Sequence, residues 1–95
     1  MKYIIEDEFH CEYIWEFDIL EDAISELKKL SVTKWMEWRN RPPCTSWKTC
    51  VRDYLLMEFS DTTKSPWKQE RRENIFSINE NGIKWSENSF LNPNS

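Results

Sequence analysis

The chain of 95 residues contains one glycine and one histidine, and this scarcity excludes several classes of site. Loops that cradle phosphates or dinucleotides need several glycines at fixed spacing, so a chain whose only glycine is Gly82 has neither. Three cysteines occur, Cys11, Cys44 and Cys50, but no Cys-x-x-Cys pair indicates zinc. We therefore expect no metal and no cofactor.

Long apolar runs are also missing. No segment approaches the ~20 apolar residues of a membrane span, and residues 1–5 lead directly into acidic residues 6–8 rather than into a signal-peptide core. Three cysteines without close spacing favour free thiols, although Cys44 and Cys50 could pair if a loop brought them together. We expect a cytoplasmic protein, monomeric in isolation, that does not associate with membranes.

The surroundings of the single histidine, His10, in the sequence do not favour metal binding or catalysis. Neighbouring residues of a strand point to opposite faces, so His10 and Cys11 are poorly placed to bind one metal ion. A nucleophile–base pair could join His10 to Cys44 or Cys50, but no orienting motif surrounds these residues. We therefore expect a solvated histidine on a strand, and a protein that is not an enzyme.

The chain is rich in aromatic residues, and its charges are distributed unevenly along the sequence. Aromatic residues make up 15% of the chain, and the net charge is −4. Residues 1–31 carry nine acidic and three basic side chains, whereas residues 32–52 carry five basic and one acidic. The length predicts a single domain, 1–95, with one modest core and a frayed tail over 88–95.

The stretch from Phe9 to Ile19 alternates with a period of two. Its odd positions are apolar: Phe9, Cys11, Tyr13, Trp15, Phe17 and Ile19. Its even positions are polar apart from Ile14. This pattern predicts a strand with its odd face on the core and a wet face that carries an acidic row, formed by Glu8, Glu12, Glu16 and Asp18.

Further elements follow from spacing. Residues 18–30 form a predicted helix, capped by Asp18 and Glu21, with an apolar stripe. Residues 32–40 favour a strand, 47–58 a second helix (although Val51, Leu55, Met57 and Phe59 would also suit a strand), and 65–73 a short helical turn. Residues 75–86 predict a hairpin that turns at Asn81-Gly82. The predicted class is α+β: an antiparallel sheet, made of the N-terminal strands and the C-terminal hairpin, covered on one face by one or two helices.

The segment from Lys34 to Arg52 interleaves bases with aromatics. Its candidates for holding a nucleic-acid single strand are Lys34, Trp35, Trp38, Arg39, Arg41, Trp47, Lys48 and Arg52. The net negative charge opposes phosphate binding, so nucleic acid is the alternative and not the favoured partner.

The favoured function is docking of a basic protein on the acidic face, rimmed by aromatic anchors. The residues predicted to bind this partner are Glu8, His10, Glu12, Glu16, Asp18, Glu21, Asp22, Trp35 and Trp38. As a small, acidic, aromatic-rich α+β chain without a catalytic motif, it resembles the immunity proteins that neutralise bacterial nuclease toxins, including those of contact-dependent inhibition systems. Phage-encoded inhibitors of host proteins share this profile. The resemblance implies a stoichiometric toxin inhibitor and transfers no residue roles.

Overall fold

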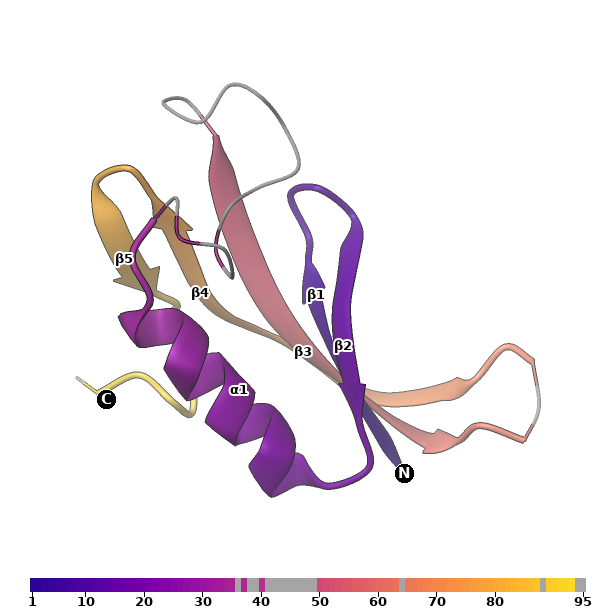
Figure 1. The fold of residues 1–95 in the computed structure, drawn as a ribbon. Helices are drawn as coiled ribbons and strands as arrows, with labels where there is room; N and C mark the ends of the chain where they lie inside the picture. The colour runs from indigo at the N-terminus through magenta and orange to yellow at the C-terminus, as the bar shows by residue number, and fades with distance from the viewer. Residues whose placement is uncertain (36, 38–39, 41–49, 64, 88, 94–95) are drawn as a thin grey trace.

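The fold is an antiparallel sheet of five strands with a helix packed against one face (Figure 1). The computed structural model describes residues 1–35, 37, 40, 50–63, 65–87 and 89–93. In chain order the elements are β1 (Lys2–Asp7), β2 (Glu12–Phe17), α1 (Leu20–Val32), β3 (Val51–Asp61), β4 (Lys68–Asn79) and β5 (Gly82–Trp85). The strand order is β2-β1-β3-β4-β5, so the N-terminal strands and the C-terminal hairpin share one sheet, as predicted.

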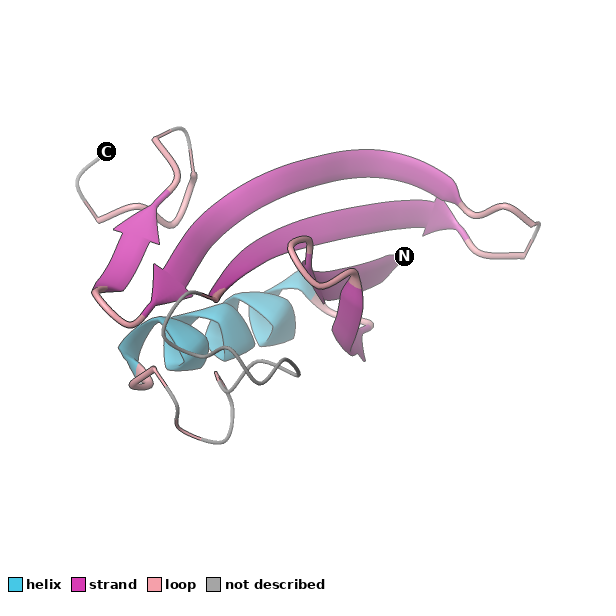
Figure 2. Cartoon of the chain, turned by 90° about the horizontal axis from the view of Figure 1, so that it is seen from above, coloured by secondary structure: helices cyan, strands magenta, loops and turns pink. Residues whose placement is uncertain are grey.

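The core lies between α1 and the sheet face that α1 covers (Figure 2). Ala23, Leu27 and Leu30 form the buried stripe of the helix, which confirms the predicted helical spacing. From the sheet, the buried cluster receives Tyr3, Ile5, Tyr54, Leu56, Ile75, Phe76 and Ile78. Each fully buried large aliphatic side chain contributes about 2 kcal/mol, so this layer is the main source of stability.

The helix α1 begins without the predicted capping box. Its N-cap residue is Ile19, which makes no side-chain capping hydrogen bond. The carboxylate of Asp18 is instead bound by Lys2 of β1, so the prediction that Asp18 caps the helix is wrong. With 13 residues α1 is too short to cross a bilayer, and the described part of the chain holds no helix long and apolar enough to do so.

The predicted helix over 47–58 is also wrong. From Val51 onward this segment is β3, which pairs with β1 on one side and with β4 on the other. Three consecutive residues, Tyr54, Leu55 and Leu56, are fully buried or nearly so. Such a run is expected of a central strand covered on both faces, and it imitates helical spacing over a short window. Residues 47–49 lie outside the described residues.

Two further predictions between the helix and the hairpin fail. Val32 ends α1, and residues 33–35, 37 and 40 form turns and bends rather than a strand. The helical turn expected over 65–73 is replaced from Lys68 by β4, whose first half is exposed. Figure 2 shows this half extending with β3 beyond the helix as a curved ribbon. Its polar sequence does not show the pattern of a strand, because this half of β4 is stabilised by backbone pairing with β3 and not by burial of its side chains.

The β4–β5 hairpin turns where predicted but in a different register. Asn79 pairs with Gly82, so Glu80 and Asn81 form the turn rather than Asn81 and Gly82. Gly82 has φ +115°, and Cys11 is the only described non-glycine residue with positive φ, so Glu80 and Asn81 lack the positive φ that a type I′ turn requires. The four apolar residues predicted to share one face still do so, because the pairs are Phe76 with Trp85 and Ile78 with Ile83.

Replacing Gly82 by valine tests the backbone requirement of this turn. A Cβ at position 82 would meet nothing within 4 Å, so any loss of stability comes from the positive φ alone. We expect Gly82→Val to lower the free energy of unfolding by about 1–2 kcal/mol, measured by urea denaturation. Glu80→Val places the same side chain at a turn residue without positive φ and should cost less; equal losses in both variants would contradict the assignment.

Candidate functional site

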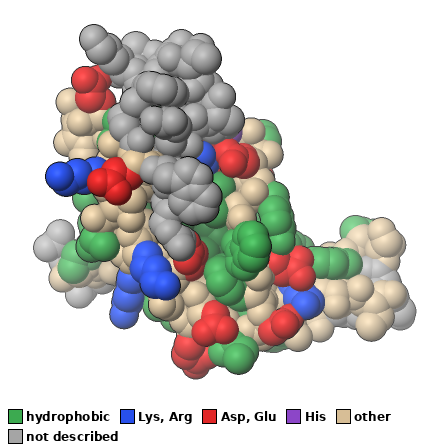
Figure 3. Space-filling view, in the orientation of Figure 1, with side chains coloured by type: hydrophobic (Ala, Val, Ile, Leu, Met, Phe, Trp, Pro, Cys, Tyr) green, Lys and Arg blue, Asp and Glu red, His purple; other side chains and the backbone are tan. Residues whose placement is uncertain are grey.

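The strand predicted over 9–19 is present, but of its predicted apolar face only Phe17 packs against the core, and most of the rest is exposed. β2 begins only at Glu12, after a turn over residues 8–11 in which Cys11 has φ +51°. Four of the apolar side chains predicted to be buried are more than half exposed: Phe9 at 58%, Tyr13 at 56%, Trp15 at 61% and Ile19 at 53%. We call these four side chains the β2 edge. Figure 3 shows hydrophobic side chains gathered on this part of the surface beside acidic ones.

A β-bulge explains why the alternation fails. Trp15 pairs with Ile5 and Tyr13 with Glu6, so Ile14 is an extra residue opposite β1. Ile14 packs against the core although it belongs to the predicted wet face. The bulge shifts the parity of the strand, so the register places Tyr13 and Trp15 on opposite faces of the sheet. The β2 edge therefore surrounds an edge strand rather than forming one flat face.

The acidic row is divided by the same bulge, and its charges are compensated within the chain. Register places Glu12 opposite the buried Asp7 and Glu16 opposite Ile4, on different faces. The four predicted acids each meet a base: Glu8 lies 3.2 Å from Arg72, Glu12 lies 3.1 Å from Arg52, Glu16 lies 3.4 Å from Lys2, and Asp18 also contacts Lys2. The prediction of one continuous acidic row on a wet face is wrong.

Glu8 belongs to a small polar cluster beside the edge. Asn74 of β4 donates from Nδ2 to Glu8 at 2.9 Å and to Asp53 at 3.5 Å. The hydrogen bonds from Asn74 and then from Arg72 lower the pKa of Glu8. Burial raises the pKa of Asp53, against the opposing hydrogen bond from Asn74. One amide therefore favours the ionised form of two neighbouring carboxylates.

The remaining predicted binding residues are spread over the molecule. Glu21 and Asp22 are exposed in the first turn of α1, just after Ile19. Trp35 is half-buried and packs against the core, and Trp38 lies outside the described residues. Of the predicted nucleic-acid groove, Lys34 is exposed and Arg52 is buried, while Arg39, Arg41, Trp47 and Lys48 fall outside the described residues.

A buried polar network, which the sequence did not indicate, lies where β1, β2 and β3 meet the C-terminal end of α1. Asp7, fully buried, accepts hydrogen bonds from the backbone N–H of Phe9 at 3.1 Å and of Asp53 at 2.9 Å through Oδ1. Its Oδ2 lies 2.5 Å from His10 Nδ1 and 3.4 Å from Arg52 Nη1. A buried carboxylate is tolerated at this position because donors surround it.

Arg52 and Asn40 extend the network to the helix. Arg52 donates from Nε to the Asn40 carbonyl at 3.1 Å, while Asn40 donates from Nδ2 to the carbonyls of Leu30 and Thr33 at 3.0 and 2.6 Å. Tyr54 donates its hydroxyl to Asn40 Oδ1 at 2.9 Å, and burial raises the pKa of this hydroxyl well above its ordinary value. Asn40 thus satisfies carbonyls at the end of α1 that a helix leaves without intrahelical partners.

His10 is part of this network, so the expectation of a solvated histidine is wrong. Its side chain is 11% exposed, and its Nε2 lies 3.0 Å from Cys50 Sγ. In the sequence, His10 and Cys50 are a possible base and nucleophile without an orienting motif around them. The orienting group is Asp7, three residues before His10, whereas the thiol lies 40 residues further along the chain.

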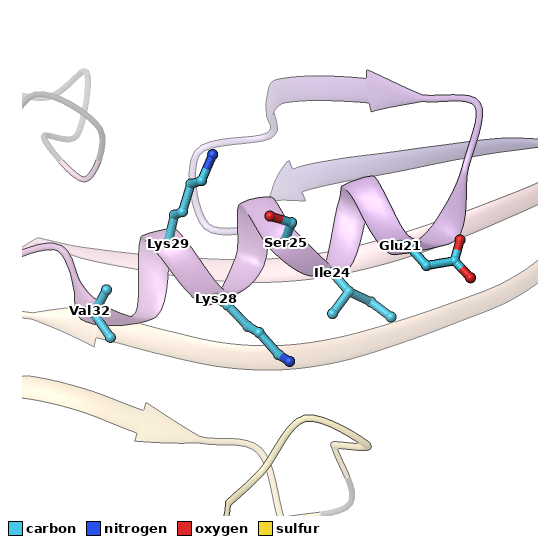
Figure 4. Close-up of a pocket in the computed structure, with 6 residues that line it drawn as sticks. All are labelled: Glu21, Ile24, Ser25, Lys28, Lys29 and Val32. Atoms are coloured by element: carbon cyan, nitrogen blue, oxygen red, sulfur yellow. The ribbon is translucent and has the colours of Figure 1, made fainter.

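The rest of the described residues contain no metal centre, and a groove lies along the helix α1. No cluster of three or more His, Cys, Asp or Glu side chains among them is arranged to hold a metal ion. A groove of about 640 Å³ runs along α1, lined by Glu21, Ile24, Ser25, Lys28, Lys29 and Val32. Figure 4 shows Lys28 and Lys29 extending to opposite sides of the helix, so its cations do not converge on one ligand.

Removing the amide of Asn74 should shift two carboxyl groups together. In Asn74→Ala the pKa of Glu8 and the pKa of Asp53 should both rise. Both pKa values can be measured by NMR titration of the carboxyl groups. Folding lowers the pKa of Glu8, so ionised Glu8 stabilises the folded protein at any pH above the pKa that it has in the unfolded chain. This stabilisation is lost as the pH falls through the pKa of Glu8 in the folded protein. The variant should therefore lose more stability at pH 7 than at acidic pH. A pKa of Glu8 that stays in place would contradict this role of Asn74.

Removing the cation of the buried network should cost far more than removing a surface cation. Arg52→Met leaves the fully buried Asp7 without its cationic partner, and we expect a loss of about 3–5 kcal/mol in urea unfolding. Arg72→Met breaks a half-exposed pair and should cost about 1 kcal/mol or less. The double variant Asp7→Asn/Arg52→Met should lose less than the sum of its two single variants. Equal costs for Arg52 and Arg72 would contradict the role of the pair.

Comparisons with protein-family models, with curated proteins and with solved structures find no match to this chain.

Proposed function

We propose that this protein binds another protein, and that the β2 edge is its docking surface. The observation that carries this proposal is the exposure of four large apolar side chains, each more than half accessible, on and beside one edge strand. Exposed aromatic groups that gather on one part of a surface are typical of interaction sites, where they act as anchors.

The bulge in β2 supports recognition through side chains. A regular edge strand can accept an added strand, but a bulge disrupts the row of backbone donors and acceptors that such pairing needs. The register places Tyr13 and Trp15 on opposite faces, so a partner that contacts both must surround the strand. Recognition through side chains, rather than through strand addition, fits this geometry.

The charge beside the edge supports a basic partner. The exposed acids Glu21 and Asp22 lie two and three residues after Ile19, and the whole chain carries a net charge of −4. Complementary charge would raise the association rate and select the partner. We propose a basic, nuclease-type toxin domain as this partner, which makes the protein a stoichiometric inhibitor of the immunity class and not an enzyme. Nucleic acid is not proposed, since Arg52 is buried against Asp7 and Glu12.

Site-specific crosslinking in the native host tests this proposal. A photoreactive benzoylphenylalanine in place of Trp15 should capture one basic partner, whereas the same group in place of Phe90, exposed on the C-terminal segment, should not. The purified partner should be a nuclease-type domain, and co-expression of this protein should restore growth of cells that produce it. An acidic partner, or no difference between the two positions, would overturn the proposal.

Once the partner is purified, the anchors can be ranked by substitution. The double variant Tyr13→Ser/Trp15→Ser should weaken binding by at least about 2 kcal/mol, roughly 30-fold in Kd, because buried aromatic anchors carry most of the binding energy. Val32→Ser removes an 83% exposed apolar side chain from α1 and should leave Kd unchanged. Titration calorimetry gives Kd, and circular dichroism verifies that each variant is folded.

Charge reversal of Glu21 and Asp22 should slow association and reduce its dependence on salt, because exposed charges act through long-range steering. Stopped-flow kinetics at two salt concentrations measure both effects. Glu12 is unsuitable for this test, since it pairs with the buried Arg52. An association rate that Glu21→Lys/Asp22→Lys leaves unchanged would show that the partner does not approach over the start of α1.

A further inference from the structure

The thiol of Cys50 meets an imidazole that a buried carboxylate holds in place. Cys50 is 7% exposed, its Sγ lies 3.0 Å from His10 Nε2, and His10 Nδ1 lies 2.5 Å from Asp7 Oδ2. A nucleophile within hydrogen-bond reach of a base, which is itself oriented by a third group, is the arrangement that activates cysteines. Phe9 of the β2 edge packs edge-on against the His10 ring, with 5.0 Å between the ring centroids, but the chemistry of the thiol does not depend on the proposed docking function.

The hydrogen-bond partners determine which nitrogen of His10 carries its proton. An ionised carboxylate only accepts hydrogen bonds, so Nδ1 must donate to Asp7. Arg52 and the backbone N–H groups of Phe9 and Asp53 also donate to Asp7, so both of its carboxyl oxygens act as acceptors. Nε2 of the neutral ring therefore presents its lone pair to the thiol. When the proton moves from Sγ to Nε2, the imidazolium that forms is stabilised by the carboxylate behind it.

We propose that Cys50 is a peroxide-reactive thiol, and that His10 and Asp7 are its positioning residues. A nearly buried thiol suits a reactant as small as hydrogen peroxide, whose size is close to that of water. The thiolate attacks one peroxide oxygen, so an S–O bond forms and the O–O bond breaks. The leaving hydroxide takes the proton from His10 and departs as water. Cys50 is oxidised by two electrons to a sulfenic acid, and the peroxide is reduced.

The chain contains its own reference for an ordinary thiol. Cys11 is exposed and lies next to His10 in sequence, but its Sγ donates to the carbonyl of Glu8 at 3.8 Å. If exposure alone controlled oxidation, Cys11 would react faster than Cys50. If the imidazole activates the thiol, Cys50 reacts faster in spite of its burial. The ratio of the two rates therefore separates activation from a purely structural hydrogen bond.

The experiment treats the folded protein at pH 7 with hydrogen peroxide, traps sulfenic acid with dimedone, and follows each cysteine by peptide mass spectrometry. Trypsin separates residues 49–52, which contain Cys50, from the peptides that hold Cys11 and Cys44. We expect Cys50 to be labelled at least about tenfold faster than Cys11, and the difference to vanish in urea. His10→Gln, whose amide cannot take the proton, should remove the advantage of Cys50.

Cys50 labelled no faster than Cys11 in the folded wild-type protein would overturn the proposal. The same holds if His10→Gln, shown to be folded by circular dichroism, keeps the full rate at Cys50. Should His10→Gln fail to fold, the wild-type comparison of Cys50 with Cys11, with and without urea, still decides the question. Arg72→Met serves as a matched control, because it breaks an ion pair outside this cluster and should leave both rates unchanged.

Discussion

The buried pair of Asp7 and Arg52 is the interaction on which this structure most depends. Asp7 is the last residue of β1 and Arg52 is the second residue of β3, and between them they bind the turn before β2, Glu12 of β2 and the carbonyl of Asn40. Asn40 in turn satisfies carbonyls at the end of α1. A charged pair in a small core costs desolvation energy, which is recovered only when every donor and acceptor is satisfied. Its geometry therefore determines how four elements meet.

The fold class could be predicted because its evidence is local. The stripe of α1 and the C-terminal hairpin are each readable within a dozen residues, and both are present, although the hairpin turns at Glu80 and Asn81 rather than at Asn81 and Gly82. The predictions failed where pairing partners decide the structure. β3 is a central strand with three consecutive buried residues, and the first half of β4 is an exposed strand with polar side chains. Neither has a periodic pattern that distinguishes it from a helix or a loop, since the strands beside them supply the stabilisation.

The candidate site was only partly predictable for a related reason. The alternation over 9–19 correctly indicated a strand, but alternation cannot show which face is buried, and one extra residue at Ile14 reverses the parity. The aromatic side chains therefore lie at the surface, and the acidic side chains form ion pairs with Lys2, Arg52 and Arg72. His10 and Cys50 are separated by 40 residues, and no local motif signals a contact across that distance.

The sequence separation of Asp7 and Arg52 has a consequence for folding kinetics. The two residues are 45 positions apart, so their ion pair forms only after β1 and β3 have found each other. Before that step both charges are hydrated, and moving them into the core early would be unfavourable. Contacts that form after the transition state slow unfolding more than they speed folding. The pair is thus expected to prolong the lifetime of the native state while leaving the folding rate almost unaffected.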